Sequence, residues 1–163
     1  MRRHTALLLL AGAFAALVIT SAGTAAAPQR LQATFVDIYS QCPTSPPTLV
    51  FCGDGTIAGY GDAYSTASLT APPTPIPGTD CLEIHAVRTI TLSDGSGGLL
   101  LAETGTLCPP SLDAVSAAGG PFTVAKSYTI AGGTGVFAGA TGTGSDVNRS
   151  AGNSQVSVIS GTL

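Results

Sequence analysis

Tryptophan is absent from this chain of 163 residues, and only 9% of its residues are charged. Lysine and arginine together number six, and nowhere do they form the basic cluster that binding to nucleic acid or to an anionic membrane surface requires. Beyond residue 27, no stretch of about 12 residues repeats its apolar side chains every 3.6 positions. The lack of a basic cluster excludes nucleic acid as a partner, and the lack of a helical period predicts few helices at most.

Motifs of several enzyme and metal-site classes are also missing, namely CxxC, GxSxG and HExxH. Beyond the first 26 residues His85 is the one histidine, so we predict no zinc or other metal site. Residues 133–138 fit the loose pattern GxGxxA, but Gly-rich strand rather than helix follows them, so we predict no nucleotide cofactor. The sequence therefore leans against an enzyme without deciding the matter.

The chain does have a three-part leader at its start. Arg2 and Arg3 precede an apolar run over residues 6–19, and small residues follow over 21–27. The run is shorter than the roughly 20 residues that span a bilayer, so we expect residues 1–26 to be a cleaved signal peptide, with an uncleaved anchor as the alternative. No stable membrane insertion would then remain. Residues 27–163 would form one domain with four basic and nine acidic residues, a net charge of −5, located outside the cell or in the cell envelope.

Four cysteines lie beyond this leader: Cys42, Cys52, Cys81 and Cys108. An even number in an exported chain indicates two disulfides, for which three pairings exist. Proximity in the sequence favours Cys42 with Cys52 and Cys81 with Cys108. Each of these pairs brackets a stretch that can fold back on itself.

The strongest strand signal covers residues 82–92. Five of the six even positions are apolar, against one of the five odd positions, which is typical of a strand with one buried face. Asp94-Gly95 supplies a turn, and residues 99–108 return from it. In such a hairpin positions 81 and 108 lie opposite each other, as a disulfide needs.

Other segments complete an all-β pattern. A short helix of two turns at most fits residues 111–118. Prolines over residues 71–78 predict a surface connection that cannot join a sheet ladder. Gly turns that feed Gly-containing strands recur at residues 54–61, 94–106 and 132–142, and such glycines suit the bends that curve a sheet. We therefore predict an antiparallel, eight-stranded β-barrel, with a β-sandwich as the alternative. The eight expected strands are residues 31–40, 49–52, 56–69, 82–92, 99–108, 122–131, 136–145 and 155–163.

Residues 128–142, YTIAGGTGVFAGATG, resemble the signature of small secreted bacterial proteins related to the allene oxide cyclase and dirigent β-barrels. The resemblance extends to the turn at residues 94–97, the strand at 103–106 and the last three residues. It implies an eight-stranded barrel. In the plant relatives such barrels hold hydrophobic ligands and steer cyclisation or radical coupling. The dirigent-like Ala-Arg-Gly step is Ala140-Thr141-Gly142 here, and no catalytic residue of either plant family is carried over.

Three residues of the strand at 82–92 are candidates for ligand contact. Glu83 and His85 share one face, two positions apart, and would serve acid–base chemistry if that face lined a lumen; we favour the interpretation that they are exposed on the surface. Arg88 interrupts the apolar face, where a charge must be paired, either at the barrel mouth or in the cavity, and we favour a salt bridge at the rim over contact with a ligand.

The sequence thus favours a secreted, disulfide-stabilised barrel without a catalytic role, which binds a small apolar ligand or serves the cell envelope. One alternative is an isomerase or cyclase that steers a reactive substrate in the barrel cavity. Another is a surface adhesion protein, for which a large apolar patch on the outer wall would speak.

Overall fold

A computed structural model describes residues 29–39, 42, 50–108 and 122–163, which form nine strands and no helix. None of the described residues thus belongs to a helix that is long and apolar enough to cross a membrane. The expected signal peptide at residues 1–26 and the expected helix at 111–118 lie outside the described residues. The strands are β1 (Arg30–Tyr39), β2 (Val50–Ile57), β3 (Gly61–Leu69), β4 (Thr74–Pro75), β5 (Leu82–Leu92), β6 (Gly97–Cys108), β7 (Phe122–Gly135), β8 (Thr143–Ala151) and β9 (Ser154–Thr162).

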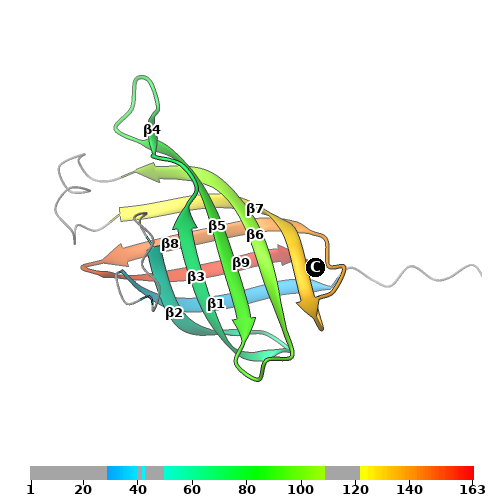
Figure 1. Ribbon diagram of the computed structural model, residues 1–163. Helices are drawn as coiled ribbons and strands as arrows, with labels where there is room; N and C mark the ends of the chain where they lie inside the picture. The colour runs from blue at the N-terminus through cyan, green and yellow to red at the C-terminus, as the bar shows by residue number, and fades with distance from the viewer. Residues whose placement is uncertain (1–28, 40–41, 43–49, 109–121) are drawn as a thin grey trace, which may run out of the picture.

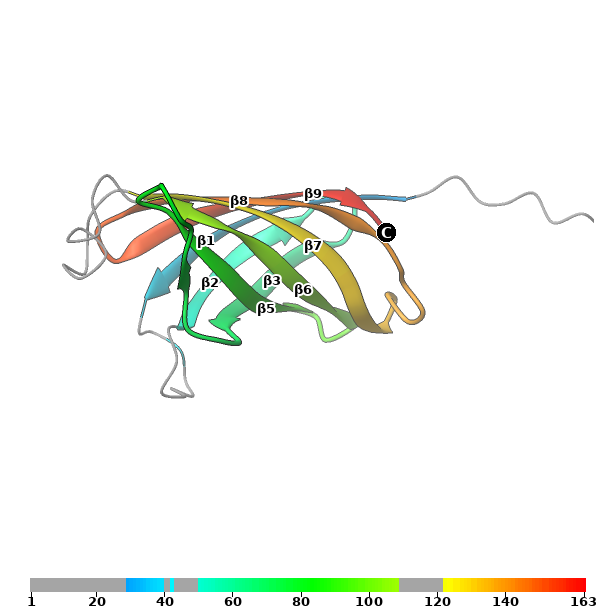
Figure 2. The same ribbon diagram turned by 90° about the horizontal axis from the view of Figure 1, so that it is seen from above.

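Eight of these strands close into an antiparallel barrel (Figures 1 and 2). Neighbours in the sequence pair with each other around the wall, β3 pairs directly with β5, and β1 pairs with β9 to complete the ring. The short β4 pairs only with the start of β5 and stands outside the ring. Closure leaves no free sheet edge around the wall. The prediction of an eight-stranded antiparallel barrel is confirmed.

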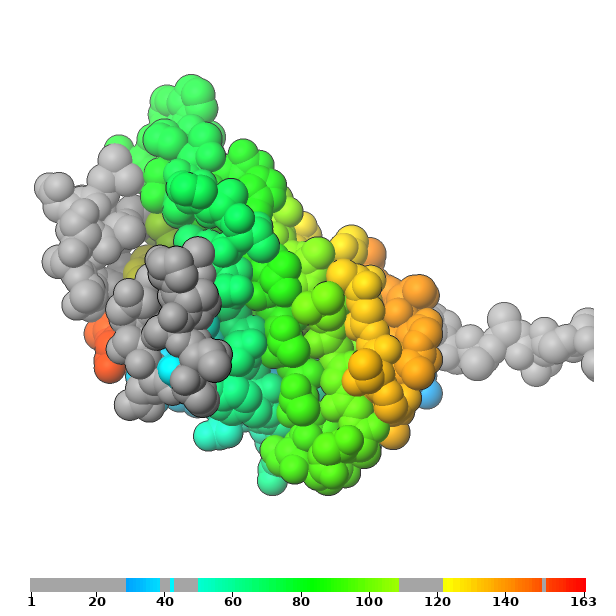
Figure 3. Space-filling view, viewed as in Figure 1, coloured from blue at the N-terminus to red at the C-terminus, as the bar shows by residue number. Residues whose placement is uncertain are grey.

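Alternation along each strand divides the wall into an inner and an outer face. In β5 the even-numbered side chains point into the barrel and are buried from Ile84 onward, whereas Glu83 and His85 point outward. The space-filling view shows how the side chains of β3, β5 and β6 form a continuous outer wall on the visible side (Figure 3). The period-2 pattern of residues 82–92 was therefore interpreted correctly.

The first hairpin is longer than predicted. The short strand expected at 49–52 continues through residue 57 as β2, and the turn falls at residues 58–60, inside the strand expected at 56–69. The expected turn at Asp54-Gly55 was wrong, because Gly55 is a strand residue that faces Phe35 on β1. A Cβ at position 55 would lie 2.1 Å from the carbonyl oxygen of Thr34. Glycine stands here to let two strands approach closely.

The strand predicted at residues 136–145 was also wrong. Strand β7 runs on to Gly135, and β8 begins only at Thr143. Gly135 and Gly139 have φ angles of 58° and 76°, which end one strand and turn the chain before the next. Between them the buried Phe137 folds back against Tyr60, with the ring centroids 4.6 Å apart. Gly135 and Gly139, which the sequence suggests as strand bends, thus form a turn that closes one end of the barrel.

The proline-rich stretch needs a smaller correction. Thr74 and Pro75 do join the ladder, opposite Glu83 and Leu82, although we expected residues 71–78 to stay out of it. Proline is tolerated on an edge strand, where its missing N–H leaves no buried acceptor unpaired. The stretch otherwise forms the surface connection that the sequence predicted.

Both predicted disulfides are present. Cys42 bonds to Cys52 and Cys81 bonds to Cys108, and no described cysteine is free. The second bond spans the mouth of the β5–β6 hairpin, where Leu82 lies opposite Leu107. Two disulfides are compatible with an oxidising environment outside the cytoplasm.

Two apolar clusters occupy the two ends of the barrel. The larger cluster fills the end with the β2–β3, β5–β6 and β7–β8 turns, and we call this the closed end. The smaller cluster, Ile84, Leu107 and Val124, lies at the opposite end, where β2, β5, β7 and β9 begin. We call this the cavity end. The middle layer between them is polar.

Candidate functional site

Arg88 projects from β5 into the middle of the barrel, and its side chain is completely buried. Nε donates to Glu103 at 3.2 Å, and Nη1 donates to Asp37 at 3.1 Å and to Ser65. Nη2 donates to Asp146 at 3.2 Å and to Ser157 at 3.1 Å. A guanidinium has five N–H groups, and these five bonds use all of them. Arg88 therefore has no donor left for a ligand.

Lys126 is the second cation of this layer. It projects from β7, and its Nζ contacts Glu103 and lies 2.6 Å from Asp146 Oδ2. The ionic layer, defined as Asp37, Arg88, Glu103, Lys126 and Asp146, thus holds three carboxyl groups against two cations. With every group ionised its net charge is −1. Buried charges persist only when they are paired and hydrogen-bonded, and this network pairs them.

The pKa shifts in this layer follow from burial and from the neighbouring charges. Burial alone would raise the pKa of Asp146, but Arg88 and Lys126 outweigh it and lower that pKa. For Glu103, burial outweighs the attraction of Lys126 and Arg88, so its pKa is raised. Burial would lower the pKa of Arg88, but the carboxylates of Asp146, Glu103 and Asp37 raise it instead. Of Asp146 and Glu103, Glu103 is therefore the carboxyl group that takes up a proton more readily.

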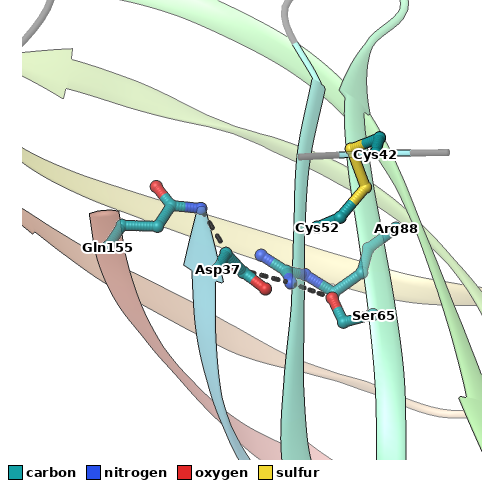
Figure 4. The surroundings of a disulfide bond; sticks show 6 residues. All are labelled: Asp37, Cys42, Cys52, Ser65, Arg88 and Gln155. Carbon is teal, nitrogen blue, oxygen red and sulfur yellow. Dashed lines mark hydrogen bonds and ion pairs between the residues drawn. A yellow bond between two sulfur atoms is a disulfide. The ribbon is translucent and has the colours of Figure 1, made fainter. Parts of the chain in front are cut away.

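Two amide side chains lie on the ionic layer toward the cavity end. Gln155 at the start of β9 donates from Nε2 to Asp37 Oδ2 at 3.2 Å, and Figure 4 shows Asp37 held between Gln155 and Arg88. Asn148 on β8 donates from Nδ2 to Asp146 at 2.9 Å and to Ser157 at 2.7 Å. Ser157 in turn donates to Asp37 at 2.6 Å. These bonds tie the amides firmly to the acids below them.

A cavity of about 90 Å³ lies above these amides at the cavity end. Its polar lining comprises Lys126, Asn148 and Gln155 below and Ser68 on the side. Its apolar wall is formed by Phe51, Ala67, Leu69, Pro73, Leu82, Ile84, Ala86, Leu107, Phe122 and Val124. The arrangement is a small apolar cup with a polar floor, which is the common form of a small-molecule site.

Two wider hollows, of about 380 and 390 Å³, lie on the outside of the wall. The first lies beside the β5–β6 turn, and the second crosses β1, β2 and β9. Neither is lined by a charged side chain. The cup is therefore the strongest candidate of these three hollows in the described part of the chain, because its apolar wall meets hydrogen-bonded polar groups.

The three residues singled out in the sequence do not share a face. Glu83 and His85 lie on the outer wall, about half exposed and 3.7 Å apart, and His85 Nδ1 lies 3.3 Å from the hydroxyl of Thr104. Arg88 lies inside. The expected salt bridge at the rim was wrong, because Arg88 and the three carboxyl groups that pair with it are completely buried. The acid–base pair of Glu83 and His85 is thus not brought to the lumen.

Sequence reasoning missed the other members of the ionic layer. Asp37, Glu103, Lys126 and Asp146 each stand at an inward position of a strand. Glu103 and Lys126 interrupt alternating apolar faces just as Arg88 does, so the same signal was available. Among the described residues, no group of three or more His, Cys, Asp or Glu side chains is placed to hold a metal ion.

Comparison of the chain with protein-family models, with curated proteins and with solved structures finds no match.

Proposed function

We propose that this chain is an exported binding protein whose barrel holds one small, mainly apolar molecule in the cup. The observation that carries the proposal is the cavity itself, with its apolar wall and its hydrogen-bonded floor. The leader expected at residues 1–26 and the two disulfides support export. The resemblance to barrels that hold hydrophobic ligands points in the same direction.

The size of the cup limits the affinity that burial alone can supply. Each methylene removed from water contributes about 0.8 kcal/mol. A ligand body of roughly five carbons would gain about 4 kcal/mol, which corresponds to a dissociation constant on the order of 1 mM. A tighter natural ligand would need to extend past Leu82 and Phe122 or to form hydrogen bonds with the floor.

Binding is favoured over catalysis because the ionisable groups near the cup are engaged with one another. Every N–H group of Arg88 donates to a neighbouring side chain, and Lys126 lies between two carboxyl groups. The alternative, an isomerase or cyclase acting in the same cavity, is favoured by one observation. Glu103, bonded to Lys126 beneath the cup, has a raised pKa and would be the proton donor.

The outer wall gives less support to a role in adhesion than the cup gives to binding. Val36, Val156 and Val158 are exposed on the paired strands β1 and β9, with Val36 directly opposite Val156. Apolar residues exposed in such small numbers are normal on a soluble surface. The cup is the feature of the described chain that calls for a function.

Native mass spectrometry of the protein purified gently from its secretion medium tests the proposal. We expect an additional mass that is lost on denaturation, and a gain of about four hydrogens on reduction, two for each disulfide. Ala86→Leu, which fills part of the cup, should lower the occupancy. Ala102→Leu makes the same change on the outer face of β6 and should leave it unchanged. A bare mass in the native state, together with no response of the cup to small apolar probes, would overturn the proposal; a ligand released chemically altered would favour the enzyme.

A further inference from the structure

We infer that the ligand of the cup presents a hydroxyl group, as an alcohol or a phenol, to the floor, and that a carboxylate is rejected. The inference rests on the proposed function and adds the chemical class of the ligand. It depends on which hydrogen-bonding atoms the floor has already used and which ones it has left. It also depends on the net charge beneath the floor.

The two amides of the floor have their nitrogen atoms turned toward the ionic layer. Both N–H groups of Asn148 are used, one on Asp146 and one on Ser157. The amide nitrogen of Gln155 donates to Asp37. Turning either amide over would place its carbonyl oxygen against a carboxylate oxygen, which is repulsive. The charges below therefore fix the orientation of both amides.

This orientation leaves the two carbonyl oxygens as acceptors. Within the described residues, every hydrogen bond of the Asn148 and Gln155 side chains runs through the amide nitrogen. Neither oxygen is fully buried, because the fully buried polar atoms without a partner in the described chain are Asp37 Oδ1 and the Tyr128 hydroxyl. Since both residues line the cup, their oxygens are the acceptors that a ligand meets. A ligand that reaches the floor must therefore bring a donor.

Lys126 and Gln155 each add one donor to the same floor. The Lys126 ammonium group carries three N–H groups, and two of them are directed at Glu103 and Asp146. One N–H of Lys126, which also lines the cup, therefore remains, and so does the second N–H of the Gln155 amide. A hydroxyl both donates and accepts, so it satisfies this combination, whereas a methyl group satisfies neither partner. Leaving a buried polar group unpaired is what costs affinity.

The net charge of the ionic layer argues against an anionic ligand. Three carboxyl groups face two cations, and protonation of Glu103 would only make the layer neutral. No surplus positive charge is available to pair with a carboxylate, and an unpaired buried carboxylate is strongly disfavoured. The ligand class is therefore a neutral hydroxyl compound with a small apolar body.

Three probes of similar shape test this class: cyclopentanol, methylcyclopentane and cyclopentanecarboxylate. Titration is followed by the methyl NMR signals of Ile84, Leu107 and Val124, which lie against the cup. We expect cyclopentanol to bind about 5- to 10-fold more tightly than methylcyclopentane, the ratio of one well-formed hydrogen bond. The carboxylate should not shift these signals at the same concentrations.

A pair of matched substitutions locates the effect. Gln155→Met removes one acceptor from the floor, and the preference for the alcohol should fall to about 2-fold or less. Gln32→Met makes the same change at an exposed position of β1 and should keep the full preference. Equal binding of the alcohol and the hydrocarbon by the unaltered protein, or tighter binding of the carboxylate, would overturn the inference and leave the proposed function standing. Failure of all three probes to shift the signals would instead count against the proposed function.

Discussion

Replacing Arg88 with methionine should destabilise the barrel strongly, and the structure supplies the magnitude. The substitution keeps much of the side-chain length but removes five hydrogen bonds and the central positive charge. Breaking a buried ion pair by removing one partner costs about 3–5 kcal/mol, because the remaining charge is left uncompensated. Three carboxyl groups would then face Lys126 alone. We expect a loss of about 4 kcal/mol, against a total stability of roughly 5–15 kcal/mol for a domain.

The same substitution should change how stability depends on pH. In the unaltered protein the pKa of Asp146 is lowered, so its contribution is present above the ordinary carboxyl range and is lost as the pH falls. Without Arg88, burial would favour the protonated form, as it already does for Glu103. The variant should therefore gain stability as the pH falls, and the difference between the two proteins should be largest near neutral pH.

Urea unfolding followed by circular dichroism or tyrosine fluorescence would measure both effects, since the chain has four tyrosines and no tryptophan. Thermal unfolding should show a midpoint lower by roughly 10 °C. Arg149→Met, on the exposed face of β8, is the control and should change stability by no more than about 0.5 kcal/mol. A loss below about 1 kcal/mol for Arg88→Met, or a loss independent of pH, would refute the view of a fully desolvated ionic layer.

Three further predictions concern other parts of the barrel. Tyr128→Phe removes a buried hydroxyl that has no partner in the described chain, so we expect the free energy of unfolding in urea to rise by about 1 kcal/mol. A lower free energy of unfolding would show that the hydroxyl is paired. Burial raises the pKa of Tyr128 to about 12, so the stability of the unaltered protein should fall as the pH rises from about 10 through 12. Tyr128→Phe should show a smaller fall in the same titration. Removing the Cys81–Cys108 bond, which closes a separation of 27 residues, should lower the free energy of unfolding by about 3.5 kcal/mol. Removing Cys42–Cys52, with a separation of 10, should lower it by about 2.7 kcal/mol. The reverse order in paired alanine variants would contradict this entropic estimate.

Local patterns were sufficient to predict the β5–β6 hairpin. Alternation over residues 82–92, the turn at Asp94-Gly95 and the position of Cys108 opposite Cys81 are all short-range signals, and the structure has each of them. The same alternation separates the candidate site residues in the sequence itself. Glu83 and His85 stand at odd positions and Arg88 at an even one, so they cannot face the same side of one strand. Only Arg88 reaches the interior.

The ionic layer could not be assembled from the sequence, because its members come from separate strands around the ring. Asp37 and Asp146 lie 51 and 58 positions from Arg88, and only the register of a closed barrel brings them to one level. The strand boundaries near residues 136–145 failed for a related reason. A Gly-rich segment suits both a curved strand and a turn, and the burial of Phe137 at the closed end decides for the turn.

The ionic layer is a costly way to fill a barrel, and this bears on what the cup does. Well-packed apolar residues of similar volume would hold the middle of the lumen at equal or greater stability. Apolar side chains, however, would leave Asn148 and Gln155 without the acids that orient them, and amides buried without partners are disfavoured. The acids below thus keep the two amide oxygens turned toward the cavity, and Arg88 keeps the acids in place. A function in binding explains the ionic layer, because a binding site needs a polar floor with fixed acceptors beneath an apolar wall. A barrel with a purely structural role does not need such a floor.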